Sequence, residues 1–294
     1  MLINRIVPYL FLPVPFFLAW IIFSHNFKAI IPLLLPVLIF GSLYYPYLLP
    51  RFTQSVARDF ELSVMTYNVL YSDSDSDAVA NLILTYHPDL VALQEVQPSM
   101  MDALEERLGI EYPYSIMGTE NDFGTTAVFS RHPFTNTHIL DLQADRPAVV
   151  VKAKVHDEEI TFVAVHLLAY GLWWVKLKDI PATVVERTAD QNRQVETLLD
   201  TLKDEDGIVI IGCDCNSYET SSSYRIMEQS LNSAAREIGW LLNENEVKNV
   251  SPDTVLQHID YVWYRGSLKP VRIYTINESG GSDHLPVLAL FELK

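Results

Sequence analysis

Short apolar runs with strand character alternate with helical patterns along most of this chain, and that alternation limits its possible folds more than any other feature. Buried strands are expected at 62–70 and 90–94, and the helices that follow them at 77–86 and 98–109. Five strand-like runs then occur between 114 and 166 without an intervening helix, which is typical of antiparallel sheet. We therefore expect an α/β fold in which two sheets pack together with helices outside.

The last third of the chain continues this pattern. A long polar helix is expected at 186–202, a strand at 208–211 and a second helix at 223–238. No repeat or low-complexity segment interrupts the pattern, so we expect one domain over residues 62–294. Its three closing strands are expected at 259–264, 271–275 and 287–292.

Two apolar runs without charged side chains precede this domain, at 6–23 and 29–50. Both approach the ~20 residues that a helix needs to cross a bilayer, so we expect a transmembrane helical hairpin over residues 1–50 and a juxtamembrane linker over 51–61. Three prolines in the first run leave a signal sequence or a re-entrant segment as its alternative. The lipid bilayer is thus an expected partner. We expect the protein in the cell membrane, with the side on which the large domain lies left open.

The part of the chain after residue 61 is strongly acidic. It carries 17 basic and 35 acidic side chains, a formal net charge of −18. Proteins that grip nucleic-acid backbones usually carry a basic stripe, because binding releases counterions from the phosphates. No cluster of lysines or arginines occurs in this sequence, so nucleic acid is disfavoured as a substrate without being excluded.

Cys213 and Cys215 lie on either side of Asp214. Residues two apart on a strand point to the same face of a sheet, but this spacing is too short for an easy disulfide. Two thiols are also too few for a structural zinc site. We therefore expect two unpaired, buried small side chains.

Polar side chains of the kinds that bind metals and phosphates recur where apolar strands end. Packed α/β folds present such side chains together at one rim. Their oxygen-rich chemistry, with few imidazoles and no pattern of coordinating thiols, favours Mg²⁺ or Mn²⁺ over zinc. Each residue alone is more often a solvated loop residue or a helix cap, so the prediction depends on the whole set. The eight candidates are Asn68, Glu95, His166, Asp214, Asn216, Asp260, Asp283 and His284.

The motifs around these candidates have the order and spacing of a known family. They are VMTYNVL, VALQEV, GTTAVFSRHPF, FVAVHL, GCDCN, HIDYV and GSDHLPV. With these motifs, residues 62–294 resemble the endonuclease/exonuclease/phosphatase superfamily, which includes DNase I-like nucleases, inositol polyphosphate phosphatases and neutral sphingomyelinases. The resemblance implies a catalytic domain with the DNase I-like four-layer α-β-β-α sandwich fold. One departure is Cys215, which stands where an aromatic residue is common in the family.

The resemblance also implies which residues hold a metal ion. Glu95, assisted by Asn68, would bind the divalent cation, and Asp283 would share in binding it. Mg²⁺ or Mn²⁺ suits such a donor set. The chain would therefore be a metal-dependent phosphoric ester hydrolase.

Five further residues would carry the reaction. Asp214 would position and deprotonate the attacking water, and Asn216 would hold that water and a phosphate oxygen. His166 would donate to a phosphate oxygen as charge develops on it. Asp260 would orient His284, which would contact the phosphate or help to activate water. Phosphate esters repel anionic nucleophiles, so such a site must both neutralise the phosphate and supply a base.

The segment 167–185 contains two adjacent tryptophans, Trp173 and Trp174, and has no clear strand or helix period. One interpretation is that it packs on the protein's own core or on the N-terminal helices. The other is that it faces lipid or gates the substrate, because tryptophan favours the bilayer interface.

The expected function is hydrolysis of phosphodiesters or phosphomonoesters at a membrane, by a monomer that prefers lipid or small-molecule phosphates as substrates. An endonuclease or exonuclease is the alternative among enzymes. A catalytically silent binding module is the alternative from a different class, because a fold can outlive its chemistry.

Overall fold

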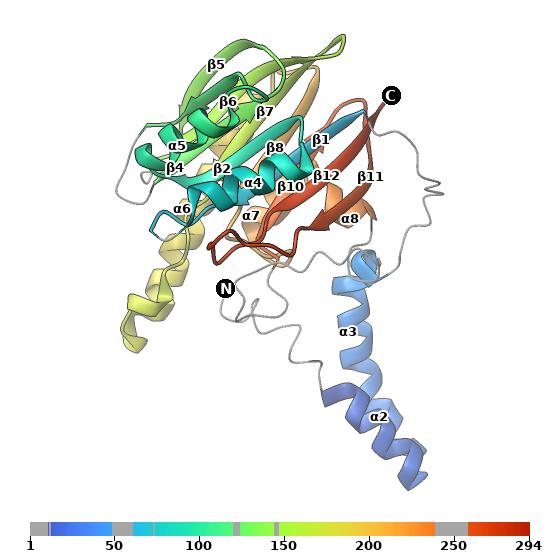
Figure 1. Ribbon diagram of the computed structural model, residues 1–294. Helices are drawn as coiled ribbons and strands as arrows, with labels where there is room; N and C mark the ends of the chain where they lie inside the picture. The colour runs from blue at the N-terminus through green and yellow to red at the C-terminus, as the bar shows by residue number, and fades with distance from the viewer. Residues whose placement is uncertain are drawn as a thin grey trace.

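The computed structural model describes residues 11, 13–48, 61–72, 74–119, 124–143, 147–238 and 258–294. The expected linker over 51–61 lies outside this part of the chain except for Glu61. Two six-stranded sheets pack face to face, and helices cover the outer face of each (Figure 1).

The first sheet has the strand order β11-β12-β1-β2-β4-β3. β1 (Leu62–Asn68) and β2 (Leu90–Val96) run parallel at its centre, because helix α4 (Ser76–Tyr86) carries the chain back between them. The remaining pairs in this sheet are antiparallel. The other elements of this half are α5 (Pro98–Leu108), β3 (Tyr114–Met117), β4 (Thr125–Ser130), β11 (Leu268–Thr275) and β12 (Val287–Leu293).

The second sheet has the order β5-β6-β7-β8-β10-β9 and the same plan. β7 (Glu158–His166) and β8 (Ile208–Asp214) are parallel, and helix α6 (Ile180–Leu202) connects them. The remaining pairs are again antiparallel. They involve β5 (Phe134–Asp141), β6 (Pro147–Val155), β9 (Asn232–Ser233) and β10 (Asp260–Arg265).

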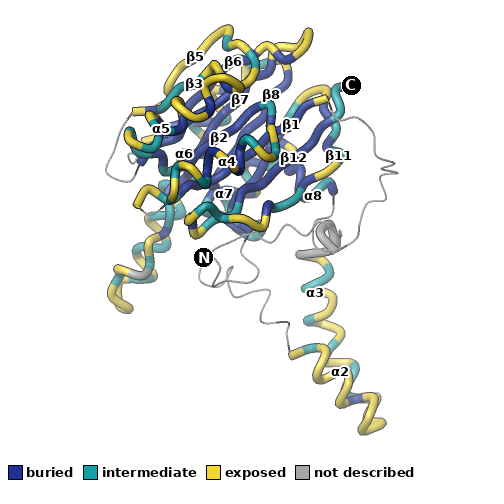
Figure 2. Tube along the Cα trace, in the orientation of Figure 1, coloured by how far each residue is buried: buried dark blue, intermediate teal, exposed yellow. Residues whose placement is uncertain are grey.

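Three apolar clusters hold these layers together. The cluster between the sheets joins side chains such as Val64 of β1 to Phe162 of β7 and Ile210 of β8. A second cluster lies between the first sheet and helices α4 and α5, and a third lies between the second sheet and α6. Figure 2 shows the strands buried between exposed outer surfaces. The expected four-layer α-β-β-α sandwich is therefore confirmed.

The single helix expected at 223–238 is wrong. The chain forms a short helix, α7 (Ser222–Met227), then the two-residue strand β9, then a second short helix, α8 (Ala234–Ile238). Asn232 and Ser233 pair with Tyr264 and Trp263 at the edge of the second sheet. This non-local pairing, together with the weak helix preference of asparagine and serine, interrupts the helix.

The N-terminal helices form part of what the apolar runs predicted. Helix α2 (Pro13–Ser24) and helix α3 (Ile30–Leu48) pack together around a short turn, η1 (Phe27–Ala29). Among the residues described, however, no helix combines the length and the hydropathy needed to cross a membrane. α2, with 12 residues, spans only about 18 Å of the ~30 Å of hydrocarbon. The transmembrane hairpin is thus not supported by the described residues.

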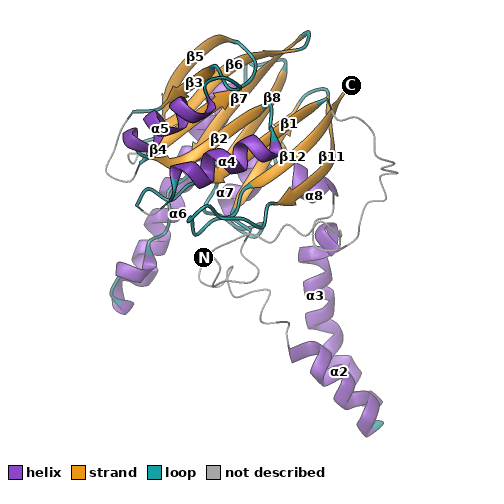
Figure 3. Ribbon diagram, viewed as in Figure 1, coloured by secondary structure: helices purple, strands orange, loops and turns teal. Residues whose placement is uncertain are grey.

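The strands that carry predicted site residues end at one edge of the sandwich. β1, β2, β7 and β8 all end at the lower edge in the view of Figure 1. The N-terminal part of α6 and the pair α2 and α3 project from the same lower side (Figure 3). We call this edge the catalytic rim.

Candidate active site

Strand register brings four of the predicted residues to the catalytic rim. Asn68, His166 and Asp214 are the last residues of β1, β7 and β8. The sequence predicted all three near strand ends, although it placed the end of the first strand at residue 70 and that of the strand before Asp214 at residue 211. His166 lies opposite Asp214 in the parallel pair β7 and β8, and Asp260 lies opposite Asp214 in the antiparallel pair β8 and β10. The side chains of His166 and Asp260 therefore flank Asp214 from the two neighbouring strands of the second sheet.

The two sheets approach each other closely beside this acid because β8 contains Gly212. A Cβ atom added to Gly212 would lie 2.6 Å from the Cβ of Ala92 in β2 and 3.1 Å from the Cβ of Thr66 in β1. The close approach lets the Nδ2 of Asn68 donate a hydrogen bond to Oδ2 of Asp214 at 2.9 Å. Glycine at this position thus joins the ends of strands from different sheets.

Asp214 is the centre of the site. Its Oδ2 lies 3.3 Å from Nε2 of His166 and 3.9 Å from Nε2 of His284, and its Oδ1 accepts from the backbone N–H of Asn216 at 3.1 Å. Burial raises the pKa of the Asp214 carboxyl to about 7, and the nearby Asp260 adds to this, although His284 and the Asn68 hydrogen bond oppose it. A buried carboxyl that titrates near neutral pH can accept a proton from water.

His284 is held by an acidic partner on its other side. Its Nδ1 lies 3.0 Å and 3.3 Å from the two carboxylate oxygens of Asp260, which is buried. Its backbone N–H donates to the hydroxyl of Ser282, which in turn donates to the carbonyl of Asn68. Burial lowers the pKa of the His284 imidazole, but the charges of Asp260 and Asp214 outweigh burial and raise it to about 10. His284 is therefore an imidazolium at neutral pH, with a charge suited to a phosphate oxygen.

Glu95 is aimed by a bulge in the first sheet. Its φ is 60°, and the register between β2 and β4 shifts beside it, between Leu93 and Val96. Gly124 packs so closely that a Cβ there would lie 2.6 Å from the carbonyl carbon of Glu95. The carboxylate accepts from the backbone N–H of Tyr71 at 3.3 Å and lies 3.8 Å from Nε2 of His166. The bulge thus turns the carboxylate of a strand residue toward the rim.

Asn216 lies in a turn that is hydrogen-bonded to helix α6. Its φ is 44°, and its side-chain amide donates to the carbonyl of Leu167 at 3.1 Å. Gln191 of α6, which is buried, places its Nε2 within 3.2 Å of the carbonyl oxygens of Leu168, Cys215 and Asn216. Gln191 was not among the residues predicted from the sequence. Its position on the buried face of α6, four residues before Val195, was the available signal.

The structure thus links seven of the eight predicted residues by contacts within 4 Å. Asp283 is the exception: its exposed side chain lies beside His284 along the chain. Its charge contributes to the raised pKa of His284.

The expectation for the two cysteines is half wrong. Both are buried, as expected, but they form a disulfide. Because β8 ends at Asp214, the chain bends there and brings the two Cα atoms to 5.1 Å, whereas residues two apart in an extended strand lie about 6.6 Å apart. The cross-link therefore closes a small ring around Asp214.

The family is decided by a match along most of the domain. The model of the Endonuclease/Exonuclease/phosphatase family matches residues 65–284. This chain belongs to that family. As a member of the endonuclease/exonuclease/phosphatase family it is a hydrolase. Domains with this fold are generally phosphoesterases. No curated protein sequence matches the chain.

Solved structures of other proteins share this fold. The endonuclease/exonuclease/phosphatase from Beutenbergia cavernae is 21% identical with a TM-score of 0.64, covering 80% of this chain and 72% of its own. The family protein from Bacteroides vulgatus is 17% identical with a TM-score of 0.63, covering 79% and 99%. D. rerio TDP2 complexed with single strand DNA product is 18% identical with a TM-score of 0.63, covering 79% and 98%. Identities this low relate the folds alone.

The donor atoms of this endonuclease/exonuclease/phosphatase domain fit a divalent cation. Asp214, Asp260 and His284 offer ligand atoms that all lie within 4.8 Å of one another. In that trio, however, the imidazole already contacts both carboxylates, and the two acids are 1% exposed. The Glu95 side chain, at 16%, is more open to solvent. Carboxylate and amide oxygens such as those of Glu95 and Asn68 suit Mg²⁺ or Mn²⁺.

Proposed function

We propose that this chain is a divalent-metal-dependent phosphoesterase that acts at a membrane on lipid or small-molecule phosphate esters. The observation that carries the proposal is the position of Asp214. Its carboxylate lies within 4 Å of an amide from the other sheet and of two imidazoles, those of His166 and His284. A base and groups that can neutralise an anion thus stand together, as phosphate hydrolysis requires.

Asp214 is the proton acceptor in this mechanism. Water held against the carboxylate would lose its proton to Asp214 as its oxygen attacks the phosphorus atom. The P–O bond to the ester's alcohol would break in the same step, and the released alcohol oxygen would take a proton from solvent. The Asn68 amide, donating at 2.9 Å, fixes the orientation of the carboxylate. The disulfide and the Gln191 hydrogen bonds hold the backbone on the C-terminal side of the acid. The base is therefore preorganised before the substrate binds.

The imidazoles stabilise the negative charge that develops on the phosphate. Asp260 keeps His284 protonated and oriented, so that its Nε2 faces the site. His166 lies between Glu95 and Asp214, where it can donate to a phosphate oxygen. Glu95 and Asn68 would hold the metal, and Asp283 would share in binding it. A bound cation would supply further neutralisation of the phosphate.

Charge and exposed apolar surface support the membrane setting and the substrate class. The formal net charge of −18 after residue 61 opposes the binding of long polyanions. Helices α2 and α3 expose large apolar side chains, among them Phe16, Phe23, Ile31 and Leu38. Such surface is suited to lipid.

Cleavage of nucleic acid is the second candidate. The observation that favours it is the similar fold of D. rerio TDP2, whose structure is a complex with single strand DNA product. A short single strand requires fewer cationic contacts than a duplex, so the acidic charge of the domain opposes the binding of a single strand less strongly.

The deciding experiment is a substrate panel with the full chain purified in detergent. Sphingomyelin, phosphoinositides, a chromogenic phosphodiester, single-stranded DNA and double-stranded DNA are each tested with Mg²⁺, Mn²⁺ or chelator. We expect metal-dependent turnover that is highest on lipid or small esters and is lost in Asp214→Asn. Faster turnover of DNA would establish the nuclease instead. If none of these substrates were turned over with either metal, the remaining candidate would be a catalytically silent binding module.

A further inference from the structure

A projecting segment beside the catalytic rim keeps large apolar side chains in solvent. We call residues 171–185 the tip: it contains η2 (Leu172–Trp174), η3 (Leu177–Asp179) and the start of α6. Trp174 is 92% exposed, Leu177 87% and Val185 72%. Of the two interpretations of this segment, packing on the core does not hold for Trp174. The side chain of Trp173 lies outside the described part of the chain.

This exposure is concentrated. In the described part of the catalytic domain, seven large apolar side chains are exposed, and three of them lie in the 15 residues of the tip. The others are Tyr71, Ile110, Tyr114 and Ile139. Exposed apolar side chains that occur singly need no explanation, whereas a cluster on a projection marks a contact surface.

The tip leads into a part of α6 that is packed on the protein. The second half of α6 buries Val195, Leu198 and Leu202 against the second sheet, and Gln191 bonds to the turn that carries Asn216. Figure 2 shows this change from an exposed to a buried surface along one helix. The start of α6, which forms part of the tip, is therefore continuous with a helix half that packs on the second sheet beside the candidate site.

Charge indicates which partner the tip fits. Lys176 and Lys178 are exposed on either side of Leu177, and Asp179 is the single acid between residues 171 and 185. The tip is thus weakly basic within a strongly acidic domain. Tryptophan and lysine beside exposed aliphatic side chains are the combination that binds the interface of an anionic bilayer.

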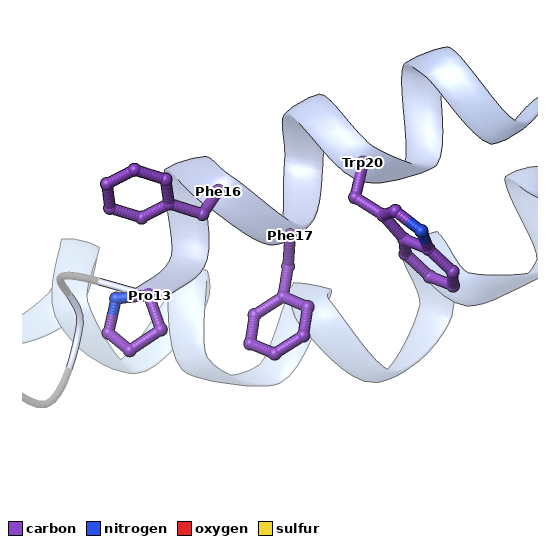
Figure 4. A pocket seen from close by; sticks show the side chains of 4 residues that line it. All are labelled: Pro13, Phe16, Phe17 and Trp20. Carbon is purple, nitrogen blue, oxygen red and sulfur yellow. The ribbon is translucent and has the colours of Figure 1, made fainter.

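A second apolar surface lies on a helix that projects from the same side of the molecule. Helix α2, which projects from the same side of the sandwich as the tip, carries a hollow lined by Pro13, Phe16, Phe17 and Trp20 (Figures 1 and 4). This hollow lies on the N-terminal hairpin and not among the catalytic residues. The tip and α2 thus provide two apolar contacts on the side of the molecule where the catalytic rim opens.

We infer that the tip inserts Trp174 and Leu177 into the surface of an anionic phospholipid bilayer and so turns the catalytic rim toward lipid headgroups. The inference rests on the proposed function for its substrate, a phosphate ester presented at the bilayer. Its physical basis is independent of the chemistry. It predicts a contact that exists in the absence of catalysis.

The test uses the full chain and vesicles of phosphatidylcholine with phosphatidylserine. Brominated phospholipid quenches tryptophans at the interface, so wild type should lose more fluorescence than Trp174→Phe. In a second assay, Trp174→Ala/Leu177→Ala should lower turnover of vesicle phospholipid about tenfold, with turnover of a soluble chromogenic diester kept within about twofold. Lys176→Gln/Lys178→Gln should weaken only the response to phosphatidylserine. The matched control is Ile110→Ala, which removes an apolar side chain that is 96% exposed elsewhere.

Equal quenching of wild type and Trp174→Phe would overturn the inference, and so would equal losses on soluble and vesicle substrates. If the tip variants instead broke a self-association seen by light scattering, with no change in quenching, the surface would be a protein contact and the inference wrong. Failure to hydrolyse any ester would count against the proposed function alone, because the quenching measurement needs no turnover.

Discussion

The side-chain amide of Asn68, at the end of β1, donates a hydrogen bond of 2.9 Å to Oδ2 of Asp214, at the end of β8. The two residues belong to different sheets and are 146 positions apart in the chain. The geometry of the Asp214 carboxylate therefore depends on how closely the sheets pack, and not on either strand alone.

Asp214→Asn should reduce turnover of a chromogenic phosphodiester by at least about a hundredfold, because the amide cannot accept a proton from water. The urea midpoint should stay the same or rise, since a neutral amide costs less to bury than a carboxylate. Asn68→Ala keeps the acid but removes its orienting donor, so we expect a smaller loss, about tenfold. Steady-state kinetics with saturating Mg²⁺ compare the two variants. Equal activity of Asp214→Asn and wild type would contradict the mechanism.

Gly212→Ala should destabilise the domain by about 1–3 kcal/mol, because the added methyl lies 2.6 Å from the Cβ of Ala92 and strand backbones must shift to admit it. Ala92→Gly removes the opposing methyl. In the double variant we expect part of the loss to be recovered, limited by the Thr66 Cβ at 3.1 Å. Urea unfolding of the four proteins gives the coupling energy. Strictly additive effects would show that the two positions do not meet.

Local patterns predicted the strands well, and with them the residues that end strands. Asn68, His166 and Asp214 were predicted at the rim because each follows an apolar run, and each closes its strand in the structure. Glu95 was also predicted as a site residue. The direction of its side chain, however, depends on the bulge in β2 and on Gly124, which packs against the Glu95 backbone only after folding. A sequence pattern carries no signal for that approach.

The misses have a common physical cause, which is competition from non-local contacts. The expected helix over 223–238 is broken because Ser233 pairs with Trp263 of a later strand. Gln191 was overlooked because its acceptors, the carbonyls of Leu168 and Asn216, lie on loops that only the fold brings to α6. Propensity and periodicity describe a segment by itself and cannot weigh these contacts.

Gln191→Leu tests whether α6 positions the turn in which Asn216 lies. Leucine fills the space but leaves three carbonyl oxygens without this donor, so we expect a loss of about 1–3 kcal/mol in unfolding free energy. A positioning role further predicts that kcat falls several-fold while KM for a soluble diester stays constant, because Asn216 moves relative to the reacting phosphate. The neighbouring Asn192→Ala serves as the control and should change neither constant. A stability loss with unchanged kcat would reduce Gln191 to a structural residue.

Asp89 should make the stability of the domain depend on pH. Its carboxylate accepts from the backbone N–H and hydroxyl of Ser63 and lies beside His132 and Arg131, at the strand ends opposite the catalytic rim. Burial raises the pKa of Asp89, but the hydrogen bonds from His132 and Ser63 outweigh it and hold the pKa below its ordinary value. A carboxyl with a lowered folded pKa stabilises the fold above its unfolded pKa, and this contribution is lost as the pH falls through the folded pKa.

Asp89→Asn should therefore lower the free energy of unfolding by about 1–3 kcal/mol at pH 7 and by nearly the same amount at pH 5. The difference in unfolding free energy between variant and wild type, here called the gap, should narrow toward pH 3 as the wild-type carboxyl takes up its proton. Urea unfolding at the three pH values measures the gap. Asp141→Asn is the matched control, because this acid is exposed and makes a local bond to the backbone of Gln143. A gap that stayed constant from pH 7 to pH 3 would mean that the variant acts through packing and not through the charge of Asp89.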